Sequence, residues 1–502
     1  MAFNNFIKTI TSTVWVCIIG VFLTQFAWGQ SNIKFDIVLT GGRVIDPETG
    51  LDAVKNVGIQ NGRITEISDN SLIGHENIEV SGLVVAPGFI DLHVHGIGNK
   101  EQEYQVHDGV TTALELEWGV GFLKEWYAAR ASKALINYGA SVPWYFSRLK
   151  TMREEDTKVS EFRESTSGGN FSFAKSFSYA ASSFNKELSA RQIAEMLANI
   201  KKSLADGGVG IGNPIGYVPG ATREEIFRLY QLAGDLQAPV FTHVRKGGAM
   251  AVQQVISDAV LTNAPLHIVH INSMTLGEIE LAIEMVNTAQ KRGFDITTEL
   301  YPYTAASTDI SSVLFNEGWQ SRFGMSYNDL QWVTTGERLT EKTFKTYRKE
   351  GGTVIMHMMK PAWIQAGISS AGTIIASDGM PYAKLAHPRT AGTFSRVLGK
   401  YVREDNVLSL AEAINKITFL PAKRLEKIAP IMRFKGRIQV GADADITIFN
   451  PATIIDKATF EKGLEFSEGI RYVMVNGVFV VKKGKTVEGV FPGQPIYGKY
   501  KK

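Results

Sequence analysis

The chain has 502 residues, of which 44% are hydrophobic and 10% aromatic, and its 53 Lys and Arg against 50 Asp and Glu give a formal net charge of +3. This length allows one large catalytic domain and a smaller one. The balanced charge argues against nucleic-acid binding and against a general attraction to membranes, so the composition favours a small-molecule partner.

The first 29 residues have the layout of a secretory signal peptide. Lys8 precedes the apolar run VWVCIIGVFLTQFA, and the small-residue pattern Ala27-Trp28-Gly29 follows it. We expect cleavage after about Gly29, because the run is short for the competing interpretation, a membrane anchor of about 20 residues. The only cysteine, Cys17, lies inside this segment. The mature protein is therefore expected to be periplasmic or secreted, without disulfides and without stable membrane insertion.

Short strand-like runs at the two ends of the chain predict a small β domain. FDIVLTGGRVID, KNVGIQNGRITEIS and LVVAPGFID are broken by Gly, Asn and Asp and show little helical periodicity. GADADITIFN and IRYVMVNGVFVVKKGKTVEG have the same character near the C-terminus. The simplest architecture joins residues 33–88 and 430–490 in one discontinuous β-sandwich domain.

Residues 89–429, between these ends, alternate strand-like and helical runs. Two long stretches, ARQIAEMLANIKKSLADGG and LGEIELAIEMVNTAQKRG, are helical, and the strand-like runs are GVTTALELE, ALINYGASV, GGVGIG, APVFTHV, LHIVHIN, FDITTELYPY and GTIIASDG. Repeated β and α units with apolar strands predict an α/β fold, a parallel sheet closed into a TIM-like (β/α)₈ barrel. The alternative, an open doubly wound sheet, lacks support because no Gly-rich phosphate loop follows the first strand.

Two stretches do not fit a simple barrel unit. About seventy residues separate YPYTAAST from IIASDG, more than one barrel helix needs, and we expect an insertion around residues 309–370 that covers the site as a lid. Residues 153–177 are polar and rich in serine, and we expect them to form a mobile surface loop.

Histidines and carboxylates stand at the ends of several predicted strands. In APGFIDLHVHG the two histidines alternate onto one face, because strand side chains have a period of two, and the glutamates of ALELE do the same. FTHVR, LHIVH and IIASDG add one residue each. The series is His93, His95, Glu115, Glu117, His243, His270 and Asp378. Because strand ends converge at the mouth of a barrel, this nitrogen and oxygen set suits one or two Zn²⁺ ions.

The other histidines are assigned different roles. His267 lies three residues before His270 and so faces the opposite way on a strand. We expect His267, His357 and His75 to be structural histidines and His107 to face solvent. A further one, His387 in AHPRTAGTF, either helps to shape the site or packs its loop.

A site of this kind predicts hydrolysis of an amide or a related C–N bond. A bound metal lowers the pKa of water to about 7 and polarises a carbonyl oxygen, while Asp378 accepts the proton of the attacking water and delivers it to the departing amine. Tyr303 in YPYTAAST either donates a hydrogen bond to the developing oxyanion or is an amphipathic aromatic residue at the barrel rim.

With these residues in place, the sequence resembles the amidohydrolase superfamily and, within it, the D-aminoacylase (N-acyl-D-amino-acid deacylase) family. The resemblance covers nearly the whole mature chain, through VLTGGRVIDPETG, VVAPGFIDLHVH, GVTT, THVR, VHIN, YPYTAAST, SDGMP and HPRTAGTFSRVLGKYVRE. It implies a (β/α)₈ barrel beside a small β-sandwich, zinc at the barrel mouth, and hydrolysis of an N-acyl-D-amino acid to a carboxylate and a free D-amino acid.

The resemblance also implies roles for single residues. His93 and His95 match the first-strand pair of the family, His243 and His270 match the ligands of the tightly held zinc, and Asp378 matches the catalytic aspartate.

One family ligand has no counterpart. The family's metal-binding cysteine follows GVTT closely, and Trp118 occupies that position here. We expect Glu117 to replace it as a terminal or bridging ligand, because Glu117 lies nearer the strand end than Glu115. The alternative is that both glutamates are buried ion-pair partners, although two carboxylates inside a barrel without a cation would be unfavourable.

Substrate contacts are also implied by the resemblance. Arg245, Tyr303 and Ser307 match family positions near the substrate. Asn272 stands where the family usually has a lysine, and Lys246-Gly247-Gly248 replaces a more usual acidic run. If Lys246 faces the site, an acidic amino acid such as D-glutamate is favoured; if it faces solvent, it has no such role.

Two other functions remain open from the sequence. A dipeptidase or cyclic-amide hydrolase of the same superfamily often uses a carboxylated lysine, which GGVGIGNPIGY lacks, although a glutamate can take the same role. A catalytically silent barrel acting as a binding protein predicts a broken ligand set, whereas all the expected ligands stand here in order. No motif indicates an oligomeric state.

Overall fold

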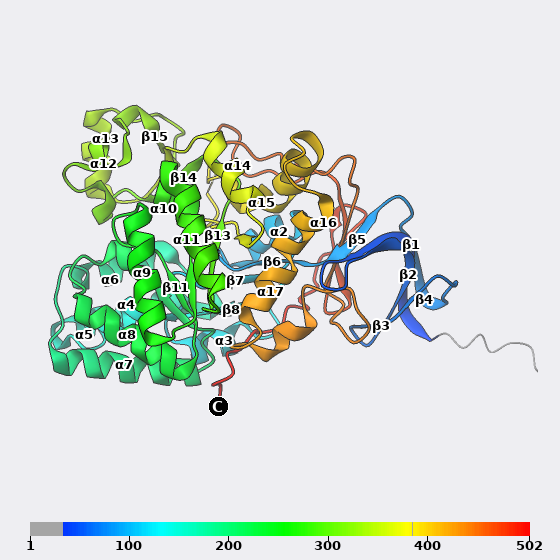
Figure 1. Cartoon of the computed structure of the whole chain (residues 1–502), viewed down its shortest axis with the longest axis horizontal. Helices are drawn as coiled ribbons and strands as arrows, with labels where there is room; N and C mark the ends of the chain where they lie inside the picture. Colours follow the sequence, from blue (N-terminus) through cyan, green and yellow to red (C-terminus); the bar gives the residue numbers. More distant parts are fainter. Residues whose placement is uncertain (1–33, 384) are drawn as a thin grey trace, which may run out of the picture.

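The computed structural model describes residues 34–383 and 385–502 (Figure 1). The predicted signal peptide, residues 1–29, lies outside this part of the chain. Within the described residues, the membrane-span criteria of length and apolar character are met by none of the helices.

The centre of the molecule is a barrel of parallel strands. A three-stranded sheet, β6-β7-β8, and a six-stranded sheet, β9 to β17, share one strand that is interrupted at Ser141, which makes eight barrel strands. The ring closes where Val94 forms a parallel bridge with Gly379. The strands are β6 (Phe89–Asp91), β7 (Val110–Glu115), β8 (Asn137–Ala140), β9 (Val142–Pro143), β10 (Ile211–Asn213), β11 (Val240–Thr242), β12 (Leu266–Ile268), β13 (Ile296–Leu300) and β17 (Thr373–Ile375).

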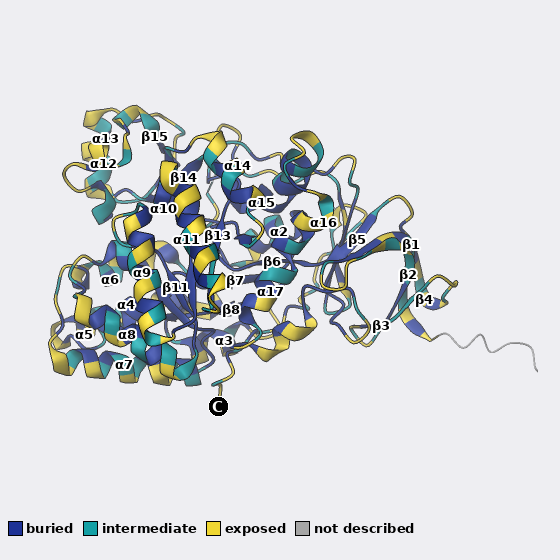
Figure 2. Ribbon diagram, in the orientation of Figure 1, coloured by how far each residue is buried: buried dark blue, intermediate teal, exposed yellow. Residues whose placement is uncertain are grey.

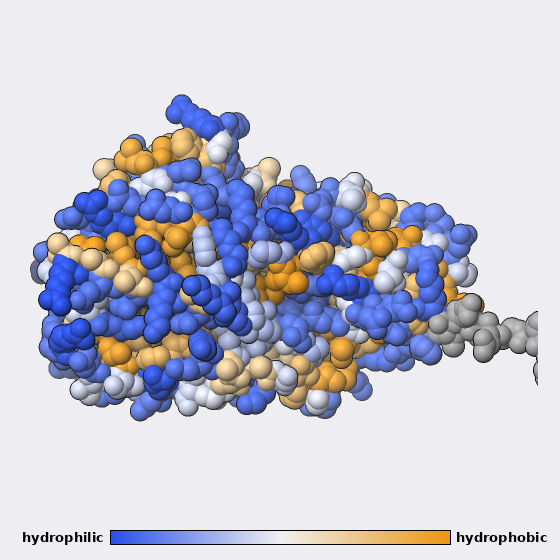
Figure 3. Space-filling view, turned by 90° about the horizontal axis from the view of Figure 1, so that it is seen from below, coloured by the Kyte–Doolittle hydropathy of each residue, from blue (hydrophilic) through white to orange (hydrophobic). Residues whose placement is uncertain are grey.

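Amphipathic helices cover the outside of the barrel. In α7, the buried residues Ile193, Met196, Ile200 and Leu204 recur every three or four positions, so one stripe faces the strands. Figure 2 shows the same division, with exposed outer faces and buried inner faces. The covering helices are α2 (Asn99–His107), α3 (Leu123–Arg130), α7 (Ala190–Ala205), α8 (Arg223–Leu236), α9 (Ala249–Thr262), α11 (Ile279–Lys291), α14 (Pro361–Ser369), α15 (Arg389–Arg396), α16 (Leu410–Ile417) and α17 (Phe419–Leu425). The face drawn in Figure 3 is mainly hydrophilic, with apolar residues in small groups.

The two ends of the chain build a separate nine-stranded sheet. Strand β18 pairs antiparallel with β5, which places the C-terminal strands beside the N-terminal ones (Figure 1). Its two halves enclose one core, in which Leu39 and Val57 meet Ile446 and Met474. The strands are β1 (Phe35–Asp46), β2 (Leu51–Gln60), β3 (Arg63–Ser68), β4 (Gly74–Glu79), β5 (Val84–Pro87), β18 (Ile446–Phe449), β19 (Ile470–Val475), β20 (Val478–Lys482) and β21 (Lys485–Thr486). The predicted fold, a barrel with a β-sandwich made from both chain ends, is confirmed.

A small antiparallel sheet and two helices form a lid on the barrel. Strands β14 (Ala305–Asp309), β16 (Thr353–His357) and β15 (Leu330–Trp332) pair in that order, and α12 (Trp319–Phe323) and α13 (Glu341–Glu350) pack beside them. This is the region in which an insertion was expected.

The expected mobile surface loop at residues 153–177 is wrong. The segment forms α5 (Asp156–Phe162), two 3₁₀ turns and the start of α6 (Phe173–Ala180), and Phe162, Phe171 and Phe177 are buried. The phenylalanines spaced among the serines supply the apolar contacts that a loop would lack.

A buried ion-pair network joins the sheet to the barrel. Lys435 Nζ lies 2.6 Å from Asp445 and 3.0 Å from Asp443, and all three side chains are buried. The Asp445 carboxylate also accepts a 2.8 Å hydrogen bond from Asn137 on β8. Because buried charges need partners, this network fixes how the two domains meet.

We predict that Lys435→Met lowers the free energy of unfolding by about 3 kcal/mol, since it leaves the buried Asp445 carboxylate without its cation, whereas Asp443 keeps Arg63 at 3.2 Å. Urea denaturation followed by circular dichroism measures the change. The exposed Lys462→Met is the matched control and should leave stability unchanged; equal stability of the two variants would contradict this role.

Candidate metal centre

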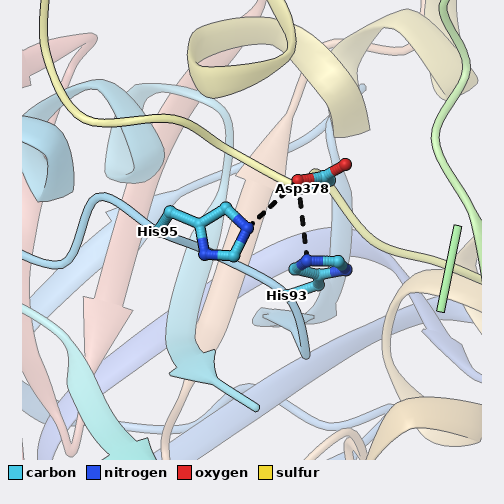
Figure 4. A group of neighbouring side chains, drawn as sticks. All are labelled: His93, His95 and Asp378. Carbon is cyan, nitrogen blue, oxygen red and sulfur yellow. Dashed lines mark ion pairs between the residues drawn. The ribbon is translucent and has the colours of Figure 1, made fainter. Parts of the chain in front are cut away.

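His93 and His95 follow β6 and cross the mouth of the barrel toward the end of β17. The backbone N–H of His95 donates to the carbonyl of Gly379 at 2.7 Å, which holds this segment in place. Both imidazoles point toward Asp378, whose Oδ1 lies 3.5 Å from the Nε2 atom of each ring (Figure 4). Three predicted site residues therefore meet at one point.

Glu117, just after β7, lies at the centre of the remaining ligands. Its Oε2 is 3.0 Å from His93 Nε2 and 3.1 Å from His95 Nε2. Its Oε1 is 2.8 Å from His243 Nδ1 and 3.4 Å from His270 Nε2. The two carboxylate oxygens thus divide the four histidines into two pairs.

Backbone strain helps to aim two of these side chains. His270 begins the short helix α10 (Ile271–Thr275) with φ 33°, and Asp378 has φ 51°. Non-glycine residues rarely adopt this left-handed conformation, and where they do the surrounding structure must hold them. His270 follows β12 and Asp378 follows β17, so the strain occurs where the chain turns toward the cavity.

The electrostatics of the cluster favour a bound cation. Burial alone would raise the pKa of Glu117, but hydrogen bonds from the surrounding histidines hold that pKa well below its ordinary value. Burial alone would lower the pKa of His93, but the charges of Asp378 and Glu299 raise it well above its ordinary value. Protons on the histidines or a metal ion can balance these carboxylates, and a metal takes the place of such protons.

The donor atoms also fit a metal in geometry and type. His93, His95 and Asp378 each offer a ligand atom within 4.8 Å of the other two, and so do His93, Glu117 and His270. All these residues are buried. Imidazole nitrogens together with carboxylate oxygens are a ligand set that suits zinc.

Two further carboxylates orient the first pair of histidines from behind. Glu299 on β13 lies 2.6 Å from His93 Nδ1 and 3.0 Å from His267 Nε2. Glu115 Oε2 lies 2.8 Å from His95 Nδ1. Such partners fix the ring orientation of a ligating histidine and increase its basicity. Sequence reasoning missed Glu299, although a glutamate inside the apolar strand of FDITTELYPY was the available signal.

Trp118, at the position of the family's cysteine, points away from the cluster. Its indole Nε1 donates to Ser176 Oγ at 2.6 Å, and its ring packs against Tyr145 and Phe177. Phe173, from the same helix α6 as Ser176, places its ring centre 4.6 Å from that of His95. The segment expected to be a surface loop therefore forms one wall of the site.

The cavity above the cluster contains only some of the predicted substrate residues. Ser307 lines it, with its hydroxyl donating to Val354 O. The hydroxyl of Tyr303 donates instead to Asp456 at 3.1 Å, and Arg245 donates to Ala221 O, so neither belongs to the cavity wall.

The cavity wall contains residues that lie close in sequence to Tyr303 and Arg245. Tyr301 and Lys246 line the cavity, each close in sequence to an expected residue. Asn272, at the position of the family's lysine, donates to the carbonyl of Tyr301 at 3.0 Å and so holds that tyrosine. The chain turns sharply at these strand ends, so side-chain direction there depends on the fold.

Arg389 lies behind the cavity wall and was missed from the sequence. Its guanidinium is buried, 3.0 Å from Asp378 Oδ1 and above the ring of Tyr301, and within the described residues it has no hydrogen-bond acceptor. Burial alone would raise the pKa of Asp378, but the charge of Arg389 and the nearby histidines lower it. The HPR sequence shortly after Asp378 was the available signal.

The remaining histidines divide into correct and wrong expectations. His267 is structural as expected, because Thr297 and Glu299 bind its two ring nitrogens. His387 bonds the carbonyl of Ala305 and accepts from the backbone of Arg389, so it packs its loop and supports the site. His357 pairs with Gln331.

The expectation for His107 is wrong: its ring is buried and stacks on Phe466 at 3.9 Å. His75 is also misassigned, because it is exposed on β4. The burial of His107 follows from its contact with Phe466, which is distant in the sequence.

Comparison with known proteins places this architecture in a family. A family model described as "Amidohydrolase family" matches residues 251–481. The D-aminoacylase of Alcaligenes xylosoxydans xylosoxydans is 30% identical over 485 residues, which cover 92% of this chain and 96% of that protein. The N-acyl-D-glutamate deacylase of the same organism is 28% identical over 481 residues, covering 89% and 94%.

A solved structure shows the same fold. The N-acyl-D-glutamate deacylase of Bordetella bronchiseptica, complexed with zinc and a phosphonate inhibitor that mimics the tetrahedral intermediate, matches with a TM-score of 0.78 and 24% identity, over 92% of this chain and 100% of that one. The chain therefore belongs to the amidohydrolase superfamily, in the family of the D-aminoacylases. With its buried cluster of His, Asp and Glu, it is a metal-dependent amidohydrolase.

We predict that Glu117→Ala lowers zinc affinity by on the order of 100-fold, because it removes the carboxylate shared by both histidine pairs, and that Glu299→Gln lowers it by about 10-fold through the orientation of His93. Bound zinc per chain, measured by mass spectrometry after competition with a chelator, tests both. Glu280→Gln, exposed on α11, is the control. Wild-type zinc content in Glu117→Ala would refute the central role of this residue.

Proposed function

We propose that the protein hydrolyses the amide bond of N-acyl-D-amino acids to a carboxylate and a free D-amino acid, with one or two zinc ions as cofactor. The observation that carries this proposal is the Glu117 carboxylate, each oxygen of which faces a different pair of histidines while Asp378 faces the first pair. The D preference is supported by the relatives, a D-aminoacylase and an N-acyl-D-glutamate deacylase.

We assign each predicted ligand to one side of Glu117. His93, His95 and Asp378 would hold a metal on the Oε2 side of Glu117, and His243 and His270 would hold one on the Oε1 side. Bound zinc supplies a Lewis acid that lowers the pKa of water and polarises a carbonyl group.

Asp378 is the proton carrier of the reaction. Arg389, 3.0 Å away, keeps its carboxylate ionised and therefore able to accept the proton of the water that attacks the amide carbon. The same carboxyl group then delivers this proton to the nitrogen as the C–N bond breaks, so the amine leaves neutral. The positive φ of Asp378 aims the side chain into the cavity for this role.

We expect the substrate carboxylate to bind beside Tyr301. This tyrosine lines the cavity with a hydroxyl that has no partner among the described residues, and the charge of Arg389 lies directly behind its ring. A donor hydroxyl backed by a fixed positive charge favours an anion. Ser307, across the same cavity, is the second predicted contact.

We predict that the protein from Gln30 onward, loaded with zinc, releases D-amino acids from N-acetyl or N-formyl D-substrates and acts at least 100-fold more slowly as Asp378→Asn, because the variant cannot carry the proton. Amino-acid release from paired D- and L-substrates, together with bound zinc, measures both.

Three results would contradict this function in different ways. Turnover of L-substrates alone would reverse the handedness. Zinc binding with no turnover of either series would direct the search to dipeptides and cyclic amides. Binding of these compounds without turnover, with the same affinity in Asp378→Asn as in the wild-type protein, would favour a silent binding protein.

We infer from residues 1–29 that the protein is exported to the periplasm or secreted. The mass of the protein recovered from the periplasm or the medium of cells expressing the full chain should correspond to a start near Gln30. Full-length protein retained in the membrane fraction would show an uncleaved anchor instead.

A further inference from the structure

Two basic residues stand at the outer wall of the cavity, on different elements. Lys246 lies three residues after His243, in the loop between β11 and α9, and Arg322 lies on α12 of the lid. Both side chains line the cavity and both residues are exposed, so they stand where solvent and substrate enter. Lid and barrel therefore each contribute one cation to the same rim.

Neither cation is neutralised by another described residue. Among residues 34–383 and 385–502, the carboxylates that line the cavity are Glu117 and Asp378, and both belong to the metal centre. Among the ion pairs of the described residues, none includes Lys246 or Arg322, although almost every other cavity-lining charge is paired. The outer half of the cavity is thus positively charged, and such a charge attracts and retains anions.

Local structure positions both side chains. Arg322 donates from Nη2 to the carbonyl of Leu314 at 2.8 Å, which holds its guanidinium against the lid, and its other N–H groups bond to no other residue in the described part of the chain. Lys246 has a left-handed backbone, with φ 63°, and Gly247 and Gly248 follow it with φ 70° and 80°. A lysine rarely adopts this left-handed conformation, and a role in the site would explain why this one does.

Much of the remaining cavity wall is apolar. It includes Met274, Leu314, Phe323, Met356 and Met358, beside the hydroxyl groups of Ser273, Ser307 and Thr308. The flexible methionines suit a methylene chain. A substrate group that fits this half of the cavity has an apolar stem and a negatively charged end.

We propose that Lys246 and Arg322 form a second anion subsite, which selects N-acyl-D-amino acids with an acidic side chain on a methylene stem, such as the glutamate type. This subsite rests on the proposed deacylase function and names its substrate class. The Tyr301 hydroxyl, with the charge of Arg389 behind its ring, holds the α-carboxylate, and the rim cations hold the acid of the side chain. A neutral side chain of equal length has the same stem contacts but lacks the ionic contact.

N-acetyl-D-glutamate and N-acetyl-D-glutamine differ only in that charge, and so they test the subsite. For the zinc-loaded protein, kcat/KM should be at least about 10-fold higher for the glutamate derivative, a preference that decreases with added salt. In Lys246→Met/Arg322→Met, which keeps the apolar stems, the ratio should fall to near one through a higher KM for glutamate, with glutamine unchanged within about twofold.

Lys342→Met, on exposed α13 of the same lid but outside the cavity wall, is the matched control and should keep the wild-type ratio. Equal turnover of the two substrates by the wild-type protein, or an unchanged ratio in the double variant, would overturn the subsite while leaving the deacylase function intact. If neither compound is hydrolysed, the proposed function fails, and calorimetric binding of the two compounds still decides the subsite: binding without preference for glutamate overturns it.

Discussion

The structure depends on one buried contact, the carboxylate of Glu117 among four imidazoles. A carboxylate inside a barrel is strongly unfavourable unless positive charge surrounds it, and here each oxygen faces its own pair of histidines. Strand ends from opposite sides of the ring must therefore meet at this point. Glu115 and Glu299 hold the far nitrogens of His95 and His93, so the cluster extends into the barrel core and not only over its mouth.

A departure from the family pattern explains why a glutamate occupies this place. Trp118 stands where the family has a metal-binding cysteine, and its indole turns outward to join Ser176, Tyr145 and Phe177. The helix that receives it, α6, also supplies Phe173 against His95. The large ring anchors the backbone after β7 while the preceding residue faces the cavity. The segment between β9 and β10 is therefore in direct contact with the metal centre.

Sequence reasoning succeeded where a feature depends on neighbours along the chain. Alternation in strands, turn residues and apolar stripes are local, and the barrel, the sandwich and the order of the polar strand ends followed from them. It failed where the direction of a side chain is set by the turn that follows a strand. Tyr301 and not Tyr303 reaches the cavity because the chain bends there, and His107 is buried by Phe466, which is distant in sequence. The helices at residues 156–180 were not predicted, because the many serines suggested a loop although the phenylalanines between them are buried.

The sequence by itself determined the fold class, the family and the list of groups that meet at the barrel mouth, because strand period and motif order are properties of the chain. Tertiary structure alone decided how those groups are divided: which glutamate lies between the histidines and which supports them, that Arg389 stands behind Asp378, and that Lys246 and Arg322 share one rim. Distances between residues far apart in the chain arise only when the ring of strands closes and the lid packs onto it.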